Sequence, residues 1–360
     1  MKAWLGLPRW SIAAPAAGWV LLGGVALGFG GFYHVLVAAG LIAGVLAAVH
    51  HAEVVAHKVG EPYGTLVLAI AVTVIEVALI VSLMLAGGPA TAGLARDTVF
   101  AAVMIILTGM VGLCMLAGGS RHGEQSFGLY GVSGALATLA AIAVLTMVLP
   151  NYTETTPGPY YSSSQLAFIA LVTLVLYGTF VLVQTVRHRD YFLPAEAAGD
   201  AEAHAAPPTA KATWTSFALL LACLGAVVLL AKSLAPSIEA VLAKAGAPEA
   251  LLGIIIAAVV LMPEGLAALR AARANRLQTS LNLALGSALA SIGLTIPTVA
   301  VLSLASGRPL ALGLDAKATV LLLLSLFLTT ISLGTGRTTV LQGVVHLVLF
   351  AVYLFTTVVP

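Results

Sequence analysis

The sequence predicts an all-α integral membrane protein, because it is apolar, poor in charge and rich in stretches long enough to cross a bilayer. Hydrophobic residues make up 60% of the 360 residues and charged residues only 8%, whereas a soluble domain carries about 25% charged residues. Such a chain has too little polar surface to fold in water. Many of its apolar stretches reach about 20 residues, the length at which a helix spans the hydrocarbon core.

Eleven apolar stretches are predicted to be transmembrane helices. They cover residues 11–31, 32–51, 63–86, 97–118, 127–149, 164–186, 213–232, 250–270, 278–304, 316–334 and 338–358. A polar, Ala/Pro-rich segment at residues 187–212 interrupts the series, and we expect it to be a cytoplasmic linker. Its four acidic residues leave a weak regulatory cation site as an alternative.

Lysine and arginine are distributed unevenly between the predicted loops. When alternate loops are assigned to opposite sides, eleven of these residues fall on one side and five on the other. The side with more positive charge usually faces the cytoplasm. We therefore expect a multi-pass protein with a cytoplasmic N-terminus and a C-terminus outside.

The predicted spans indicate an internal repeat. If the first span is set aside, five spans precede the linker and five follow it, and Glu76 and Glu264 each lie in the second span of their group. An odd number of spans makes the second repeat enter the membrane from the opposite side, as in many secondary transporters. We therefore expect a leading helix at 1–31 and inverted five-helix repeats at 32–186 and 213–360.

The two glutamates are the predicted ion site. Glu76 lies within the apolar stretch 66–85, which carries no other charge, and an ionised acid at mid-bilayer costs about 2.5–3.5 kcal/mol on insertion scales. Glu264 lies between Pro263 and Gly265, where a kinked helix would free backbone carbonyls for a cation. The alternatives are a protonated Glu76 bonded to a neighbouring helix and a simple kink with Glu264 nearer to the surface.

A pair of carboxylates predicts a divalent cation as the transported substrate. Its charge of −2 balances one divalent cation, and its oxygens suit hard cations such as Ca²⁺. Two close acids cannot both stay ionised in an empty site, so protons replace the metal when it leaves. Competition between cation and proton for the same oxygens is a mechanism of antiport, and it needs no cofactor.

Hydroxyl and amide groups near the two acids are candidate ligands. In the second half these are Asn282, Ser287 and Ser291, and the two serines share a helix face. In the first half they are Thr73, three residues before the glutamate, and Thr108. Each could instead be a helix-packing group, but as a set around two buried acids we favour the ligand interpretation.

Histidines are candidates for sensing pH, since their charge changes near neutral pH. His50, His51 and His57 cluster with Glu53 at the predicted cytoplasmic edge, and His346 lies in the last span. The alternatives are ordinary interfacial residues for the cluster and a hydrogen-bonded core histidine for His346.

Short motifs occur along nearly the whole chain. They are Gly60-Glu61-Pro62-Tyr63-Gly64, Ile75-Glu76-Val77, Arg96-Asp97-Thr98, Pro263-Glu264-Gly265, Asn282 with Leu285-Gly286-Ser287 and Ser291, Gly336-Arg337-Thr338, and Gly343 with His346. Together these motifs resemble those of the bacterial ChaA-type calcium/proton antiporters of the calcium/cation antiporter superfamily.

The resemblance implies eleven spans, a bacterial inner-membrane location and an ion site whose conserved acids are Glu76 and Glu264. It also implies exchange of Ca²⁺ for H⁺, or of Na⁺ or K⁺ for H⁺ in some members. One departure concerns the first half, which has Ile105-Ile106-Leu107-Thr108 where the second half has Gly286-Ser287. The two halves therefore need not contribute equivalent ligands.

Two other classes of function fit the sequence less well. A cation channel would be expected to show a repeated filter loop, and none is visible. An intramembrane metalloprotease needs His-Glu-x-x-His, which is absent, and a Ser287–His346 pair lacks a third group. We therefore expect a Ca²⁺/H⁺ antiporter, with a Na⁺(K⁺)/H⁺ antiporter as the alternative, and no enzyme. Its partners are the cation, the proton and lipid, with no nucleic acid, and the sequence does not set an oligomeric state.

Overall fold

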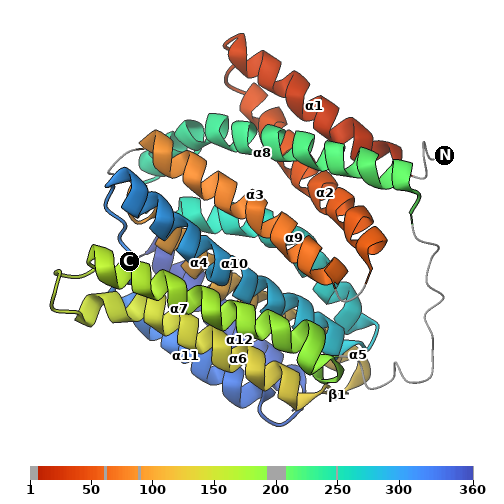
Figure 1. Ribbon diagram of the computed structural model, residues 1–360, viewed down its shortest axis with the longest axis vertical. Coiled ribbons are helices and arrows are strands. Elements are labelled where there is room, and N and C mark those ends of the chain that lie inside the picture. Colours follow the sequence, from red (N-terminus) through yellow and green to blue (C-terminus); the bar gives the residue numbers. More distant parts are fainter. Residues whose placement is uncertain (1–6, 61–62, 88–90, 193–207, 249, 360) are drawn as a thin grey trace. The chain divides into compact units, whose positions relative to one another are not determined.

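The computed structural model describes residues 7–60, 63–87, 91–192, 208–248 and 250–359, and it is almost entirely helical (Figure 1). The α-helices are α1 (Arg9–Ala26), α2 (Tyr33–Val59), α3 (Tyr63–Gly87), α4 (Leu94–Met104), α5 (Val111–His122), α6 (Leu129–Ala143), α7 (Ser163–Leu182), α8 (Ala210–Lys244), α9 (Ala250–Arg273), α10 (Leu277–Ser306), α11 (Ala316–Leu333) and α12 (Val340–Val358). Shorter elements are the π-helical segments η2 (Ile105–Met110), η3 (Val144–Val148) and η5 (Val183–Arg187), the 3₁₀ turns η4 (Leu149–Tyr152) and η6 (Arg189–Tyr191), and the strands β1 (Gln125–Ser126) and β2 (Arg337–Thr338).

The predicted fold class is confirmed. Since η2 joins α4 to α5 without a break, the described residues form eleven long helices. Ten helical stretches, all except α1, are long and apolar enough to cross a membrane. Several helices run past the predicted spans: α8 continues to Lys244, beyond the predicted end at residue 232. The predicted end coincides with Lys232, but a helix keeps its backbone hydrogen bonds when it leaves the hydrocarbon. Most of the predicted linker, residues 193–207, lies outside the described residues.

The chain divides into two compact units, each with helices from both sides of the polar segment. The first unit contains α1, α2, α3 and α8, and the second contains α4 to α7 and α9 from Gly253 to α12. In the first unit α2 packs against α8 and α1, with Val37, Leu230 and Leu234 at the core of the contact. A Cβ placed at Gly44 would lie 3.0 Å from the Val227 side chain. Small residues thus bring these helices close, as is common in membranes.

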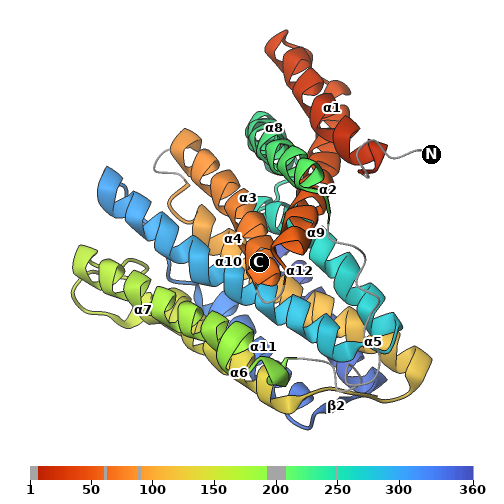
Figure 2. The same cartoon turned by 45° about the vertical axis from the view of Figure 1, so that its right-hand side comes forward.

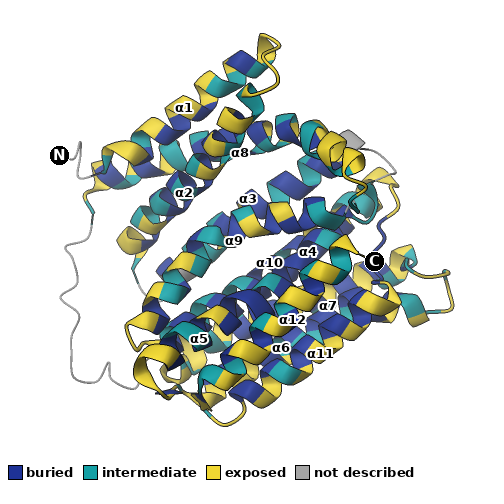
Figure 3. Cartoon of the chain, turned by 180° about the vertical axis from the view of Figure 1, so that it is seen from behind, coloured by how far each residue is buried: buried dark blue, intermediate teal, exposed yellow. Residues whose placement is uncertain are grey.

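In the second unit α10 is the central helix. It packs against α4, η2 and α5 and also against α6 and α7, and most of its length is buried (Figure 3). The helix formed by α4, η2 and α5 is the most buried of the candidate spans. These two helices are therefore the ones whose side chains are least available to lipid.

Contacts between loops define two opposite ends of the second unit. At one end β1 pairs with β2, and His122 bonds to the carbonyl of Arg273 at 3.1 Å. At the other end Arg96 donates to the carbonyl of Gly313 at 3.0 Å. Loops that the sequence assigned to one side of the membrane thus gather at one end of this unit. Which end faces the cytoplasm stays a prediction.

The helices of the second unit are related as an inverted repeat requires. The helix α4–α5 corresponds in order to α10, α6 to α11, and α7 to α12, and each pair runs in opposite directions between the two ends (Figure 2). The contacts match as well, since α5 packs on α12 as α10 packs on α7. Both α7 and α12 begin with a capping box, Ser162 with Gln165 and Thr339 with Gln342. The exact repeat boundaries stay a prediction.

Three helices of the second unit contain π-helical segments, in which amides bond five residues back. The amide of Val111 bonds to Ile106 at the end of η2, and that of Leu149 bonds to Val144 at the end of η3. Where a five-residue ladder gives way to another geometry, one carbonyl is left without its usual helical donor. In a membrane such a group must find its partner inside the protein.

The carbonyl of Leu145 in η3 shows how this requirement is met. Its usual donor, the amide of Leu149, bonds to Val144, and the next residue, Pro150, has no amide hydrogen. The hydroxyl of Tyr161 donates to Leu145 instead, at 2.5 Å. Tyr161 lies outside the candidate spans, and its burial raises its pKa to about 12.

We predict that Gly343→Ala destabilises the second unit. A Cβ at Gly343 would lie 2.5 Å from the amide nitrogen of Leu116 and 3.0 Å from the carbonyl oxygen of Gly112. These are backbone atoms that cannot move aside, and overpacking of this kind costs about 1–3 kcal/mol. The apparent melting temperature in detergent should fall. Gly178→Ala in α7 is the matched control, because no atom lies within 4 Å of its added Cβ; an equal fall in both variants would contradict the close approach.

We predict that Tyr161→Phe also destabilises the protein, by about 1–3 kcal/mol, because it leaves the Leu145 carbonyl without a donor. Tyr152→Phe is the control, since Tyr152 is 72% exposed. The pH dependence provides a second measurement. The folded pKa of Tyr161, about 12, lies above the ordinary value of about 10, so the folded state favours the protonated phenol.

This contribution to stability is complete below about pH 10 and is lost as the pH rises through the folded pKa of about 12. The melting temperature of Tyr161→Phe should therefore fall less steeply in alkali than that of the wild type. Parallel alkaline profiles would show that Tyr161 is not the titrating group.

Candidate functional site

Glu76 lies in the middle of α3, in the first unit, and is only 3% exposed. Thr73, one turn earlier and on nearly the same face, is also buried. Its hydroxyl donates to the carbonyl of Ala69 at 2.9 Å, which leaves the oxygen lone pairs able to accept. The structure thus gives Glu76 the burial that the sequence predicts, with a hydroxyl beside it.

Glu264 lies on α9, in the second unit. The helix continues without a break through Pro263, so the expected kink does not interrupt it. Because Pro263 has no amide hydrogen, the carbonyl of Val259 lacks its usual helical donor. Glu264 is half-buried and its Oε2 atom is shielded from solvent. A Cβ at Gly265 would lie 3.3 Å from the end of the Met110 side chain, so this part of α9 lies against η2.

Thr108 lies within η2 and is fully buried. Its hydroxyl donates to the carbonyl of Met104, and its lone pairs can still face a cation. The sequence of η2 is the stretch that departs from the Gly286-Ser287 motif of the second half. The two stretches also differ in structure, because η2 is π-helical whereas α10 is α-helical throughout. Such π segments frequently occur at functional sites.

Asn282, Ser287 and Ser291 lie along α10. Ser291 is buried and Ser287 is half-buried one turn earlier. The amide of Asn282 already has partners: its nitrogen donates to the carbonyl of Phe192 at 2.5 Å, and its oxygen accepts from Gln278 at 2.9 Å. Asn282 therefore holds the segment that follows α7, and its role as an ion ligand stays a prediction.

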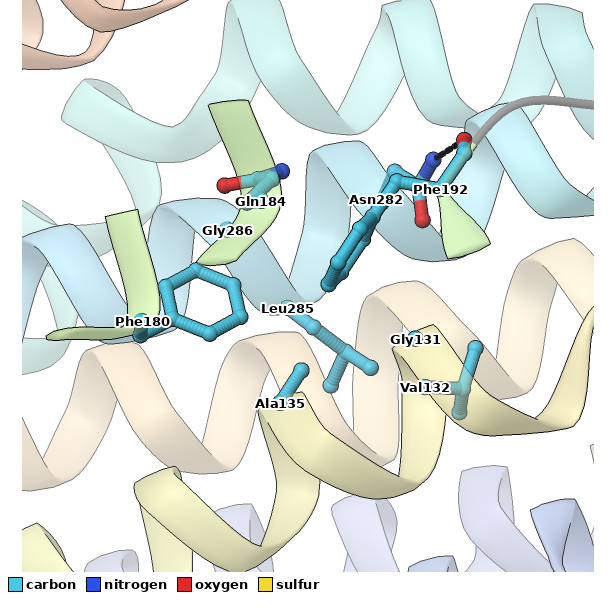
Figure 4. Close-up of a pocket in the computed structure, with 9 residues that line it drawn as sticks. All are labelled: Gly131, Val132, Ala135, Phe180, Gln184, Phe192, Asn282, Leu285 and Gly286. Carbon is cyan, nitrogen blue, oxygen red and sulfur yellow. Dashed lines mark hydrogen bonds between the residues drawn. The ribbon is translucent and has the colours of Figure 1, made fainter. Parts of the chain in front are cut away.

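Asn282 also borders a small hollow in the second unit (Figure 4). Its lining comes from α6, α7, η5, α10 and the residue that follows η6. The lining residues are Gly131, Val132, Ala135, Phe180, Gln184, Phe192, Asn282, Leu285 and Gly286. The lining is mostly apolar, and its polar side chains, Gln184 and Asn282, are amides. Because none of the described residues in its lining is acidic, this hollow is a poor candidate for the cation site.

The histidine cluster of the first unit lies on α2. The Nδ1 atom of His50 is 4.0 Å from a carboxylate oxygen of Glu53, as their proximity in sequence suggests, and His57 is exposed in the last turn. His51 is fully buried. A role of this cluster in sensing pH stays a prediction.

His51 has a structural role that the sequence did not indicate. Its Nε2 atom is 2.9 Å from the carbonyl oxygen of Ser11 in α1, and since a carbonyl only accepts, this nitrogen carries the hydrogen. The usual helical donor to Ser11 would be residue 15, which is a proline within α1. His51 therefore replaces the hydrogen bond that Pro15 removes.

His346 is buried in α12, and both ring nitrogens have partners, the carbonyl of Leu107 and the hydroxyl of Ser332. The hypothetical pairing of His346 with Ser287 is thus replaced by one with Ser332. Within the part of the chain that the structure describes, no three or more His, Cys, Asp or Glu side chains cluster as a metal site would need. Backbone and hydroxyl oxygens would have to supply the remaining ligands of a cation.

Long apolar helices, an inverted arrangement in the second unit, and one acid inside each of two corresponding helices define a multi-pass membrane protein with the architecture of an ion exchanger. The chain belongs to the sodium/calcium exchanger protein family, whose model matches residues 29–186 and 215–359. The two matched stretches are of similar length, and the polar segment separates them.

Two curated relatives are similar over most of the chain. The y4hA protein of Sinorhizobium fredii (strain NBRC 101917 / NGR234), an ionic transporter by name, is 52% identical over 330 residues, which cover 90% of this chain and 88% of that protein. The sodium-potassium/proton antiporter ChaA of Escherichia coli (strain K12) is 38% identical over 319 residues, which cover 88% and 86%. The resemblance to ChaA-type antiporters is confirmed, and the relatives are transporters rather than enzymes.

Solved structures share the fold. Native YfkE superposes with a TM-score of 0.75 at 16% identity, over 98% of this chain and 100% of that one. The H⁺/Ca²⁺ exchanger CAX superposes with a TM-score of 0.71 at 16% identity, over 96% and 87%. At this level of identity the likeness concerns the fold alone, and it is the fold of membrane exchangers.

Proposed function

We propose that the protein exchanges Ca²⁺ for H⁺ across the bacterial inner membrane, and that Glu76 and Glu264 bind the transported cation. The observation that carries the proposal is the placement of one acid inside each of two corresponding apolar helices, α3 and α9, with Glu76 almost wholly buried. Buried acids in membrane spans are costly, and they commonly mark ion pathways.

Each carboxylate would act as both cation ligand and proton acceptor. When Ca²⁺ binds, the carboxylates release their protons, and when Ca²⁺ leaves, protons neutralise the charge that it had balanced. The hydroxyls of Thr73 and Thr108, and those of Ser287 and Ser291, are oxygens of the type that hard cations prefer. A site that is never empty of both cation and protons makes the two fluxes depend on each other.

A Na⁺(K⁺)/H⁺ antiporter is the second candidate. It is favoured by the relative with 38% identity, which is named a sodium-potassium/proton antiporter. The same carboxylates would then bind a monovalent cation, so the choice of cation is a separate question from the identity of the site.

We predict that Glu76→Gln and Glu264→Gln each reduce proton-coupled cation flux by at least about tenfold, because an amide cannot exchange a proton for the cation. The purified chain would be reconstituted in proteoliposomes with a trapped pH dye, and Ca²⁺, Na⁺ or K⁺ would be added across a proton gradient. Glu239→Gln is the matched control, since Glu239 is an exposed glutamate of α8 and should behave like the wild type.

The outcomes separate the candidates. Dissipation of the gradient by Ca²⁺ supports the first, and dissipation by Na⁺ or K⁺ alone supports the second. An ion current without stoichiometric proton flux would indicate a channel. Variants that transport like the wild type would show that the two glutamates are not the site.

We predict that Thr108→Val raises the half-saturating cation concentration several-fold, because it removes one candidate oxygen ligand while keeping the shape of the side chain. Thr98→Val is a close control. Thr98 lies on the same helix, is fully buried and donates to the carbonyl of Leu94, but it lies outside η2. Equal effects of the two changes would assign Thr108 to helix packing.

A further inference from the structure

A buried histidine of α12 reaches into the π-helical segment η2. The Nδ1 atom of His346 is 2.7 Å from the carbonyl oxygen of Leu107, and its Nε2 atom is 3.2 Å from the hydroxyl oxygen of Ser332 in α11. The side chain is only 1% exposed. All three residues belong to the second unit, so the arrangement does not depend on the first.

The carbonyl of Leu107 is the one that the change of helical register releases. The amide of Val111 bonds to Ile106, five residues back, at the end of η2, although in an α-helix it would bond to Leu107. In the four-residue ladder of α5, the amide of Gly112 is expected to bond to the carbonyl of Thr108. Leu107 is thereby skipped, and His346 is its donor.

The geometry fixes the tautomer of the ring. A carbonyl oxygen can only accept, so Nδ1 carries the hydrogen, and in the neutral ring Nε2 then accepts from the hydroxyl of Ser332. Close packing holds this arrangement in place. A Cβ at Gly112 would lie 2.9 Å from Cβ of His346, and one at Gly109 would lie 3.4 Å from the ring of Phe350. Two glycines on the η2–α5 face thus let α12 approach closely enough for the contact.

We propose that His346 is a positioning residue whose Nδ1–H group holds η2 in its π-helical form. Without that donor, the Leu107 carbonyl can regain a partner if η2 returns to α-helical hydrogen bonding. This change would rotate the part of the helix before η2 by about 100° relative to the part after it. Thr108 and Met110 would then change direction, and Met110 is the residue that meets α9 beside Glu264. This inference rests on the proposed function, since it assumes that η2 contributes to cation binding.

The test compares three substitutions at His346. Asparagine and leucine have nearly the same shape, but only asparagine can donate from the position of Nδ1 to Leu107. Glutamine places its amide near the position of Nε2, where it can bond only to Ser332. In the same proteoliposomes, with Ca²⁺ as the added cation, we expect His346→Leu and His346→Gln to raise the half-saturating concentration about tenfold. His346→Asn should stay within about threefold of the wild type.

This readout separates positioning from folding, because a merely structural role would lower the amount of folded protein and leave the half-saturating concentration of the remainder unchanged. Equal values for His346→Leu and the wild type would overturn the inference, as would equal losses in His346→Leu and His346→Asn. Nitrogen NMR of labelled histidine in the wild type provides an answer even if the leucine variant does not fold. The inference requires hydrogen on Nδ1, and hydrogen on Nε2 alone would overturn it.

Failure of the proposed function has a different signature. A wild-type protein that moves no protons with Ca²⁺, Na⁺ or K⁺ would remove the transport mechanism. The protonated nitrogen of His346 would still show whether the ring holds the Leu107 carbonyl. Conversely, normal exchange by the wild type together with normal exchange by His346→Leu would remove only the role of His346.

Discussion

The structure depends on one constraint, which is that a backbone polar group inside a bilayer must find its partner within the protein. Regular helices satisfy this by themselves, but this chain interrupts its helices with prolines and π segments. At three interruptions a side chain from a neighbouring element supplies the missing donor. His51 donates a hydrogen bond to a backbone carbonyl of α1, Tyr161 to one of η3 and His346 to one of η2. These polar side chains are therefore part of the helical framework.

The same constraint indicates where irregular backbone can be useful. An interrupted ladder exposed to lipid would cost several kcal/mol for each unpaired group, so it is tolerated only inside packed protein. The helix that contains η2 is the most buried candidate span, and it meets α9 beside Glu264 through Met110. Burial thus permits two features in this region, namely backbone that departs from the α-helix and a carboxylate oxygen of Glu264 that is shielded from solvent.

Much of the fold could be predicted from the sequence, because spans and buried acids follow from composition. The burial of Glu76 and the opposed directions of corresponding helices in the second unit both follow from patterns along the chain. The π segments do not, since they depend on donors such as His346, which lies 239 residues from Leu107. For the same reason the sequence could not show that the amide of Asn282 holds Phe192. The expected kink at Pro263 does not end α9, which continues to Arg273, and whether the helix bends there stays a prediction.

The difference between the two halves bears on how an inverted repeat works as a transporter. With two identical inverted halves, the states open to either side would be related by a two-fold rotation and would have equal internal free energies. In this chain the corresponding helices differ: α4–α5 contains η2 and its histidine contact, whereas α10 is α-helical along its whole length. Exchanging the roles of the halves therefore changes the internal free energy. A ligand can shift such an equilibrium only by its difference in affinity for the two states. Under the proposed exchange mechanism, an internal difference such as that at η2 would add to the free-energy gap between the states that this difference in affinity has to offset.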